Sequence, residues 1–478
     1  MTPGTESNPL RVAIIGSGPS GFYAAEALQK QKALVVQIDM FERLPTPFGL
    51  VRGGVAPDHH KIKSVTKVYD RIAANPNFRF FGNVEFGKDI THADLVAHYH
   101  QIIYATGAQT DKRMEIPGED LPGSHAATEF VGWYNAHPDY RDLTFDLSQE
   151  RVAVVGNGNV AMDVIRILAK TQKELYATDI ADYALEALMR SKVKEIYVLG
   201  RRGPAQAAFT NPEIKELGEL ADADVIVRPE DVELDPLSRE WLMQERDRTA
   251  EGNVQTLTRY ANFKNGAHTK SRKIYMRFLV SPVEIIGKDR VEAIKIVKNQ
   301  LVRAEDGSLR PRPTGEYETI PVGLVFRSIG YQGVPLPGVV FDERSGTIPN
   351  QQGRIVDPAT NQPVTGEYVV GWIKRGPTGV IGTNKPDAQE TVNMMLEDAA
   401  SGRVLNPTAP SRSQIEELLL KRLLTYVTYE DWQILDDIEQ TYGQALGRSR
   451  LKFSRVAEML DALAERKQAA RVERVAGD

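Results

Sequence analysis

The chain has 478 residues, of which 41% are hydrophobic and 26% are charged, and its net charge is -5. This length predicts two or three domains, and a mean hydropathy of -0.34 without a long apolar run excludes a membrane-spanning helix. The acidic balance predicts no nucleic-acid binding, and residues 1–10 show no signal or Arg-rich transit peptide, so we expect a cytoplasmic protein.

The sequence contains no cysteine. A disulfide, a thiolate zinc site, a cysteine-ligated iron–sulfur cluster and a dithiol redox pair are therefore excluded on this chain. Any electron transfer must use bound organic cofactors. Among the eight histidines, His98 and His100 fit one face of a strand, but they lack a third ligand. We expect both at the surface and predict no metal site.

The first predicted elements form a nucleotide-binding pattern. A buried parallel strand at Val12–Ile15 leads into the turn 16–21, of sequence GSGPSG, and a helix follows over Phe22–Lys32. A second apolar run, Leu34–Phe41, ends at Glu42. This order of strand, turn, helix, strand and terminal acid predicts a bound dinucleotide.

Each glycine of this turn has a physical role. Gly16 permits the tight turn, Gly18 lets backbone amides approach a pyrophosphate, and Gly21 lets the helix pack closely on the strand. The positive end of the helix faces the phosphate charge. Glu42 is placed to accept hydrogen bonds from a ribose. Asp39 is a rival for that contact, but it lies inside the apolar run rather than at its end.

A loop rich in proline and glycine, residues 43–60, follows this acid and suits a wall of the cofactor pocket. We expect an amphipathic helix over Lys61–Ala74 and a strand over Phe78–Phe86. A buried strand at Ile102–Ala105 then ends in Thr-Gly, where it would meet a bound nucleotide closely. A similar pattern recurs at residues 325–330.

A second nucleotide-binding pattern lies between these two strands. An apolar strand at Val152–Val155 precedes the turn 156–161 (GNGNVA), and the next strand, Glu195–Leu199, ends in Gly-Arg-Arg-Gly instead of an acid. An acid would repel a 2′-phosphate, whereas the guanidiniums of Arg201 and Arg202 attract it. The first site is thus predicted to hold a dinucleotide with a free ribose, and the second NADP. The alternative for the arginines is a solvated turn.

Further along, a helix is expected to start near Pro212, with Asn211 as N-cap and Glu213 in its first turn. Strands are expected within Leu257–Val297. Residues 252–283 contain no acid but six basic residues, namely Arg259, Lys264, Lys270, Arg272, Lys273 and Arg277.

The last part of the chain returns to a nucleotide-binding pattern. A strand at Glu367–Ile373 contains glycine and an aromatic residue near its end, and a glycine-rich turn at 374–383 precedes a helix over Asp387–Ala400. Helical periodicity follows over Ser411–Arg466, and Lys467–Asp478 is expected to be a frayed tail.

Together these motifs resemble the adrenodoxin reductase family of FAD-containing, NADPH-dependent ferredoxin reductases, from Val12 to about Met459. The clearest matching runs are GSGPSGFYAAEAL at Gly16, PFGLVRGGVAPDHHKIKSV at Pro47, VVGNGNVAMDVIRIL at Val154, LGRRGPAQAAFTNPEIKEL at Leu199 and GWIKRGPTGVIGTNKPDAQET at Gly371.

The resemblance implies an α/β fold with two Rossmann-like dinucleotide-binding domains. A discontinuous FAD domain would comprise residues 1–110 and 331–478, the second part with a C-terminal helical segment. An inserted NADP domain would comprise residues 111–330.

The glycine turns and the resemblance together imply the residues of both cofactor sites. The FAD site would comprise Gly16, Gly18, Ser20, Gly21, Glu42, Leu50, Val84, Trp372, Gly379, Val380 and Ile381. The NADP site would comprise Asn157, Gly158, Asn159, Val160, Arg201, Arg202 and Glu213. Gly379 would also touch the nicotinamide. His59 and Glu213 match the pair that handles or positions protons in the family, and Phe86 is a neighbouring alternative to Val84.

By this resemblance, NADPH passes a hydride to N5 of FAD, and electrons then pass singly to an iron–sulfur ferredoxin. The resemblance also favours a monomer. A hypothesis from the charge pattern is that residues 259–277 help to dock an acidic ferredoxin; the alternative is a basic surface without that role.

Other functions fit less well. The lack of cysteine excludes a dithiol reductase of the thioredoxin reductase type and counts against an electron-input subunit of an amidotransferase-like complex. A flavin monooxygenase would share the two nucleotide folds, but no oxygenation motif is evident. A non-enzymatic NADP-binding scaffold would be colourless.

Overall fold

A computed structural model describes residues 3–263, 268–422 and 425–477. The chain divides into two compact units. Unit 1 comprises Met1–Val55, His59–Thr110 and Tyr331–Asp478, and unit 2 comprises Ala56–Asp58 and Asp111–Gly330. Unit 1 is therefore discontinuous in sequence, with unit 2 inserted into it.

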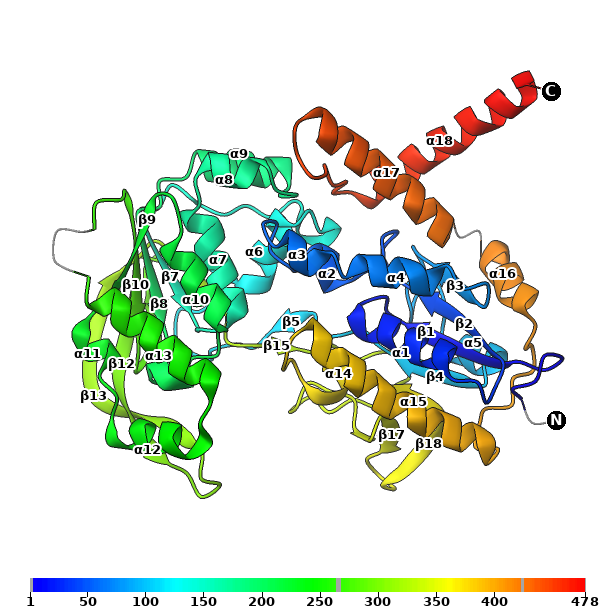
Figure 1. The fold of residues 1–478 in the computed structure, drawn as a ribbon, viewed down its shortest axis with the longest axis horizontal. Coiled ribbons are helices and arrows are strands. Elements are labelled where there is room, and N and C mark those ends of the chain that lie inside the picture. Colours follow the sequence, from blue (N-terminus) through cyan, green and yellow to red (C-terminus); the bar gives the residue numbers. More distant parts are fainter. Residues whose placement is uncertain (1–2, 264–267, 423–424, 478) are drawn as a thin grey trace. The chain divides into compact units, whose positions relative to one another are not determined.

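Unit 1 is built on a seven-stranded sheet of order β16-β17-β18-β4-β1-β2-β3. The strands from β18 to β3 are parallel, and β16 and β17 are added antiparallel at one edge. In Figure 1 the yellow β18 and the blue β4 lie in the same sheet, although unit 2 separates them in sequence. The strands are β1 (Leu10–Ile15), β2 (Val36–Phe41), β3 (Phe78–Phe81), β4 (Gln101–Tyr104), β16 (Asn350–Gln351), β17 (Arg354–Asp357) and β18 (Gln362–Val369).

Alternation along β1 divides the core of unit 1 into two layers, because successive side chains of a strand point to opposite faces. Val12 and Ile14 pack in one cluster with residues of α1 and α15, and Ala13 and Ile15 pack in the other. The helices of this unit are α1 (Pro19–Lys30), α2 (Leu50–Gly53), α3 (His60–Lys63), α4 (Thr66–Ala73), α5 (His92–His98), α14 (Trp372–Arg375), α15 (Asn384–Ala400), α16 (Arg412–Lys421), α17 (Tyr429–Ala445), α18 (Val456–Gly477) and the 3-10 turn η3 (Ile381–Thr383).

Unit 2 contains a six-stranded, fully parallel sheet of order β6-β14-β7-β8-β10-β9. An antiparallel sheet of order β11-β12-β13 packs against one face of it, where Ala153 and Val155 of β7 meet Ile285 and Ile294. The strands are β6 (Ser124–Ala126), β7 (Arg151–Val155), β8 (Glu195–Leu199), β9 (Ala223–Val227), β10 (Arg272–Arg277), β11 (Val280–Ile286), β12 (Ala293–Arg303), β13 (Leu309–Pro321) and β14 (Leu324–Arg327).

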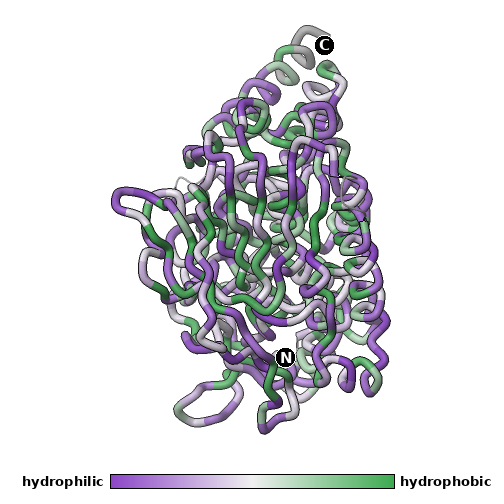
Figure 2. Tube along the Cα trace, turned by 90° about the vertical axis from the view of Figure 1, so that its left-hand side faces the viewer, coloured by the Kyte–Doolittle hydropathy of each residue, from purple (hydrophilic) through white to green (hydrophobic). Residues whose placement is uncertain are grey.

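Helices cover the other face of the parallel sheet in unit 2, against Val152 and Val154 of β7. They are α6 (Ala127–Tyr134), η1 (Pro138–Tyr140), α7 (Asn159–Ala169), α8 (Gln172–Tyr176), α9 (Asp182–Met189), η2 (Pro204–Gln206), α10 (Asn211–Gly218), α11 (Pro229–Val232), α12 (Pro236–Glu245) and α13 (Arg248–Ala261). Figure 2 shows apolar segments along interior strands and hydrophilic segments along outer loops. The short strands β5 (Thr110–Asp111) and β15 (Tyr331–Gln332) pair where the chain passes between the units.

The prediction of an α/β fold with two parallel, Rossmann-like sheets is confirmed. Each glycine turn connects a strand to a helix, β1 to α1 and β7 to α7, as expected. Within the described ranges, no helix is both long and apolar enough to cross a bilayer.

Some predicted limits in unit 1 are wrong. The helix expected over Lys61–Ala74 is split into α3 and α4, and at the break the Ser64 hydroxyl donates to the Lys61 carbonyl at 2.6 Å, a local bond that competes with the helix. The strand expected to reach Phe86 ends at Phe81, because Asn83 has a φ of 60° and turns the chain.

Other errors concern helix ends. Leu257–Ala261, expected within strands, is the end of α13, whose N-cap Asp247 accepts from two backbone amides. Thr210, not Asn211, is the N-cap of α10. The expected frayed tail continues as α18 to Gly477, since its Ala, Glu, Lys and Arg residues favour helix, and Asp478 lies outside the described residues.

Candidate nucleotide-binding sites

The turn after β1 has the backbone that its glycines require. Gly16 has a φ of 103°, and a Cβ there would lie 2.6 Å from the Ala105 carbonyl oxygen. A Cβ on Gly21 would lie 2.4 Å from the Gly16 oxygen, so α1 packs directly on the turn. Gly18 has nothing within 4 Å of its Cβ position. The middle glycine therefore leaves a bare backbone surface at the N-terminus of α1, which suits a phosphate.

Glu42 follows β2 and closes this turn from the side. Its Oε2 accepts hydrogen bonds from the Ser17 hydroxyl at 2.6 Å and the Ser17 amide at 3.2 Å. Its Oε1 accepts from the Leu44 amide at 3.1 Å. The carboxylate is half-buried beside the glycine turn, where a ribose would lie next to the pyrophosphate.

Asp39, the rival acid, is occupied elsewhere. It is fully buried, and its carboxylate accepts from Arg11, Arg79 and the Tyr99 hydroxyl at 2.7 to 2.8 Å. Although burial opposes ionisation, the bonds and charges of the two arginines hold the pKa of Asp39 below its ordinary value. This acid stabilises the interior of unit 1 and has no free oxygen for a ribose.

Three other predicted residues follow β2 or β3 in the chain. Leu50 is 39% exposed at the start of α2 and offers an apolar surface to a ligand. Val84 is buried in the core, and its amide donates to the Glu42 carbonyl at 2.9 Å, so only its backbone is placed near the expected ribose site. His59 is half-buried at the N-cap position of α3.

The returning part of unit 1 completes the surroundings of the first turn. A Cβ on Gly371, which has a φ of 77°, would lie 2.5 Å from the Ser20 hydroxyl of α1. Trp372 stacks on Tyr331 with ring centroids 5.5 Å apart, and its indole N–H donates to the Thr378 carbonyl at 3.2 Å. The strand end at Gly371 and the N-terminus of α1 are thus in direct contact.

The glycine turn before α15 is exposed. Gly379 has a φ of 79°, and Val380 is 54% exposed. Arg375 holds this turn by donating to the Thr378 carbonyl and to Asn384. The exposed backbone leads into the N-terminus of α15, which is a suitable partner for carbonyl oxygens of a ring system.

The turn after β7 repeats the first one. Gly156 has a φ of 119°, and a Cβ there would lie 2.1 Å from the Ser328 oxygen at the end of β14, as Ala105 lies beside Gly16. Gly158 has nothing within 4 Å of its Cβ position. The buried Nδ2 of Asn157 has no hydrogen-bond partner among the described residues. This turn therefore presents a bare backbone surface and an unused donor.

Arg201 and Arg202 follow β8 in the same unit. Arg201 is exposed and Arg202 is half-buried, and neither guanidinium has an ion-pair partner within the part of the chain that the structure describes. Burial and, after it, the charge of Arg201 lower the pKa of Arg202. Two adjacent cations without an ion-pair partner among the described residues, in the same unit as the second glycine turn, are suited to a phosphate.

Glu213, predicted to contact NADP, lies buried in the first turn of α10 and is bound to an arginine of α7. Arg166 Nη1 donates to it at 3.0 Å, and the same guanidinium bonds Asp58 at 2.8 Å and Asp163 at 2.6 Å. Burial opposes this charge, but the three carboxylates raise the pKa of Arg166 well above its ordinary value. Lys170 is a second cation near Asp58, at 3.1 Å.

Three of the basic residues expected to form a docking face pair with acids from elsewhere in unit 2, whereas Arg259 is exposed. Lys273 bonds Asp224 at 2.7 Å, Arg277 bonds Glu318 at 2.6 Å, and both are mostly buried. Lys270 donates to the Leu220 carbonyl at 2.5 Å. Arg272 is also mostly buried, Arg259 donates to a threonine hydroxyl, and Lys264 lies outside the described residues. Acids distant in sequence thus compensate Arg272, Lys273 and Arg277, and the docking role of the segment stays a prediction.

His98 and His100 were expected at the surface on one face of a strand, and this expectation is wrong. His98 ends α5 and bonds the Asp94 carbonyl at 2.7 Å, and both histidines are at least 92% buried. Nδ1 of His100 accepts from the Arg11 amide at 3.0 Å. Both rings lie inside unit 1, and His100 bonds an amide of β1, a contact between distant residues that the local sequence does not reveal.

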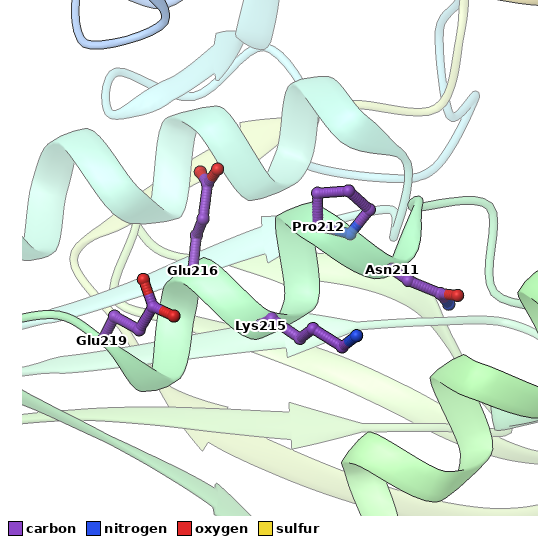
Figure 3. A pocket seen from close by; sticks show the side chains of 5 residues that line it. All are labelled: Asn211, Pro212, Lys215, Glu216 and Glu219. Carbon is purple, nitrogen blue, oxygen red and sulfur yellow. The ribbon is translucent and has the colours of Figure 1, made fainter.

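An open hollow of about 410 Å³ lies along the outer side of α10. Figure 3 shows its lining residues, with Glu216 pointing toward the neighbouring helix and Lys215 pointing away from it: Asn211, Pro212, Lys215, Glu216 and Glu219. The amide of Asn211 donates to Thr249 and Asn253 at 2.8 and 2.7 Å. None of the lining residues belongs to the glycine turns, so this hollow is not either of the predicted nucleotide sites.

Comparison with known proteins identifies the family. A model described as pyridine nucleotide-disulphide oxidoreductase matches residues 10–200. The chain is 46% identical to NADPH-ferredoxin reductase FprA of Mycobacterium tuberculosis H37Rv, over 95% of this chain and 98% of that protein. The chain belongs to the adrenodoxin reductase family of ferredoxin–NADP(+) reductases.

Two further matches agree with this family. Human mitochondrial NADPH:adrenodoxin oxidoreductase is 38% identical, over 95% of this chain and 92% of that protein. The solved structure of Mycobacterium tuberculosis FprA in complex with NADPH has a TM-score of 0.88 and 45% identity, covering 96% of this chain and 100% of that one. The likeness to the ferredoxin reductases therefore extends through both units.

Sequence reasoning missed residues that hold the predicted site residues in place. Arg166 joins Glu213 to Asp58, and buried Lys374 bonds Glu390 and Asp387 at 2.7 and 3.2 Å beneath the turn at the end of β18. The sequence signal that could have found Arg166 is a basic residue on the apolar face of α7, because a charged residue is rarely buried without an ionic partner.

Proposed function

We propose that this protein is an NADPH-dependent ferredoxin reductase that binds FAD on unit 1 and NADP(H) on unit 2. The observation that carries the proposal is the contrast between two similar turns. The first is followed by the carboxylate of Glu42, and the second by the uncompensated pair Arg201 and Arg202. A carboxylate suits a free ribose, and a guanidinium pair suits a 2′-phosphate.

The residues present fit both cofactors. Gly18 and Gly158 leave open backbone surfaces at the N-termini of α1 and α7, as a pyrophosphate requires. The unpartnered Nδ2 of Asn157 is available to a nucleotide oxygen. Asn159 is tied into the turn, since its Oδ1 accepts from the Thr210 amide at 2.9 Å, and Val160 follows it in the first turn of α7.

On unit 1, Gly16, Ser20 and Gly21 shape the turn for FAD, and Glu42 binds the ribose. Leu50 and the backbone of Val84 line the nucleotide portion. Trp372 and the backbone of Gly379, Val380 and Ile381 are proposed to surround the ring system, and Gly379 is also proposed to touch the nicotinamide. When bound, FAD would supply the redox chemistry, which is to accept a hydride and to release electrons one at a time. The protein contributes position and electrostatics, and His59 and Glu213 are proposed to hold or position protons.

The proposed electron acceptor is an iron–sulfur ferredoxin, supported by the names of the relatives. A flavin monooxygenase, or an electron-input subunit with another acceptor, is the alternative. A monomeric state and a cytoplasmic location stay predictions from the sequence.

The test is anaerobic turnover of the purified, FAD-loaded protein with NADPH and an iron–sulfur ferredoxin. We expect a yellow protein, and ferredoxin reduction that depends on both NADPH and protein. A colourless protein that does not take up FAD would contradict the flavin assignment. NADPH consumption that needs a hydroxylatable substrate and leaves ferredoxin oxidised would favour a monooxygenase.

A further inference from the structure

The turn that carries Arg201 and Arg202 is attached to the antiparallel sheet of unit 2 through its backbone. Its three successive carbonyl groups all accept hydrogen bonds from β11, β12 or the residue before β11. The Val280 amide donates to Gly200 at 3.0 Å, and the Leu279 amide donates to Arg202 at 3.1 Å. Two of these bonds are made by main-chain amides, which no ordinary substitution removes.

The middle bond is different, because a side chain makes it. Nδ2 of Asn299, on β12, donates to the Arg201 carbonyl at 2.9 Å and to the Ser281 hydroxyl at 2.8 Å. Asn299 is 97% buried, and its Oδ1 has no partner among the described residues. The two bonds from Nδ2 are therefore the side-chain bonds that hold Asn299 against this turn within the described residues.

The backbone around Asn299 is shaped for this contact. The register of β12 against β13 shifts between Val297 and Asn299, which places Asn299 at an irregularity of the strand. The Asn299 amide donates to the Leu279 carbonyl at 2.7 Å, and Leu279 has a φ of 52°, which is rare for a leucine. The strand and the strained residue thus hold the arginine turn together.

We propose that Asn299 is a positioning residue that sets the preference for NADPH over NADH. This inference rests on the proposed function, in which the two guanidiniums bind the 2′-phosphate. Bidentate recognition of a phosphate needs the backbone that carries the arginines to be fixed. Asn299 fixes the carbonyl of Arg201 without contacting the coenzyme itself.

The test compares Asn299→Leu with the matched control Ser281→Ala. The first variant removes the amide at similar volume, and the second removes only the other partner of Nδ2 and leaves the bond to Arg201. Steady-state kinetics of the FAD-loaded protein are measured with NADPH and with NADH, using ferricyanide as acceptor. Dissociation constants for 2′,5′-ADP and 5′-AMP are measured by calorimetry.

We expect Asn299→Leu to raise KM for NADPH and Kd for 2′,5′-ADP about tenfold, because the guanidiniums lose their fixed geometry. The kcat, the KM for NADH and the Kd for 5′-AMP should not change. Ser281→Ala should give the same constants as the natural protein. The inference would be overturned if a folded Asn299→Leu variant kept its preference for NADPH over NADH. It would also be overturned if KM rose by the same factor for both coenzymes. If that variant does not fold, Asn299→Ser, whose hydroxyl is too short to reach Arg201, is judged by the same outcomes.

An Arg201→Ala, Arg202→Ala variant separates this inference from the proposed function. If the double variant keeps the preference for NADPH, the assignment of the 2′-phosphate site itself is wrong. If the double variant loses the preference and Asn299→Leu does not, only the role of Asn299 is wrong.

Discussion

At the residue scale, Glu42 and Asp39 show how two acids of one strand region acquire different tasks. Glu42 is half-buried and bonds Ser17 in the glycine turn, whereas Asp39 is fully buried between two arginines and a tyrosine. Their neighbours decide their roles, since a carboxylate that already has strong cationic partners is not available to a ligand.

Replacing each acid by its amide should therefore affect different properties, FAD binding for Glu42 and stability for Asp39. Glu42→Gln should raise Kd for FAD about tenfold, because it loses a charge-assisted hydrogen bond to the ribose. Asp39→Asn should mainly lower the thermal stability of the apoprotein, because Arg11 and Arg79 lose their buried counter-charge. Flavin titration and thermal unfolding of the apoproteins measure the two effects. Equal losses of FAD affinity in both variants would contradict the assignment of Glu42.

The two glycines of the first turn make a similar contrast. Gly18→Ala should leave the apoprotein folded, because its Cβ would lie in open space, and should reduce FAD occupancy by obstructing the phosphate. Gly16→Ala should impair folding itself, because of its φ of 103° and the nearby Ala105 oxygen. The flavin-to-protein ratio and the circular dichroism of each variant check this. Full FAD occupancy in Gly18→Ala would show that the phosphate does not lie there.

At the scale of elements, Asp111 joins β5 to the start of α6. Its carboxylate accepts from the hydroxyl and the amide of Thr128, and burial raises its pKa to about 6. In the unfolded chain its pKa is about 3.9. The folded state therefore binds the proton more tightly, and the stability from that proton is lost as pH rises from about 4 through 6.

Asp111→Asn should remove this pH dependence. The Tm of the variant should increase relative to the Tm of the natural protein as pH rises from about 4 to 7. Differential scanning fluorimetry across this range measures it, with exposed Asp120→Asn as the control. A difference in Tm that does not change with pH would show that Asp111 is not protonated in the folded protein.

The elements that the sequence predicted well are those with a local pattern. The apolar runs at β1, β7 and β8 and both glycine turns contain within a few residues the features that determine their structure. The error at Lys61–Ala74 arose because a serine hydroxyl bonds the helix backbone, which periodicity does not show.

The candidate sites were less predictable where partners come from distant strands. The acid-free segment around Lys273 was expected to be an exposed basic face, but Asp224 of β9 pairs with Lys273 and Glu318 of β13 pairs with Arg277. Asn299 could not be selected at all, because its partner Arg201 lies far away in sequence and only the folded sheet brings them together.

At the scale of the whole molecule, the chain uses the same turn twice and distinguishes the copies by the residues directly after the second strand of each. Unit 1 begins with one copy and is completed by β18 and α15 after the whole of unit 2. Each unit thus has its own glycine turn, and the proposed activity requires both.

The central claim is that unit 2 selects NADPH through Arg201 and Arg202 to reduce a flavin held by unit 1. The most direct test is anaerobic stopped-flow mixing of the FAD-loaded protein with NADPH or NADH, with flavin reduction monitored as the loss of oxidised-flavin absorbance. We predict saturable reduction with a much lower half-saturating concentration for NADPH, and near loss of that difference in the Arg201→Ala, Arg202→Ala variant. Equal use of both coenzymes by the natural protein, or an unchanged preference in the double variant, would contradict the account.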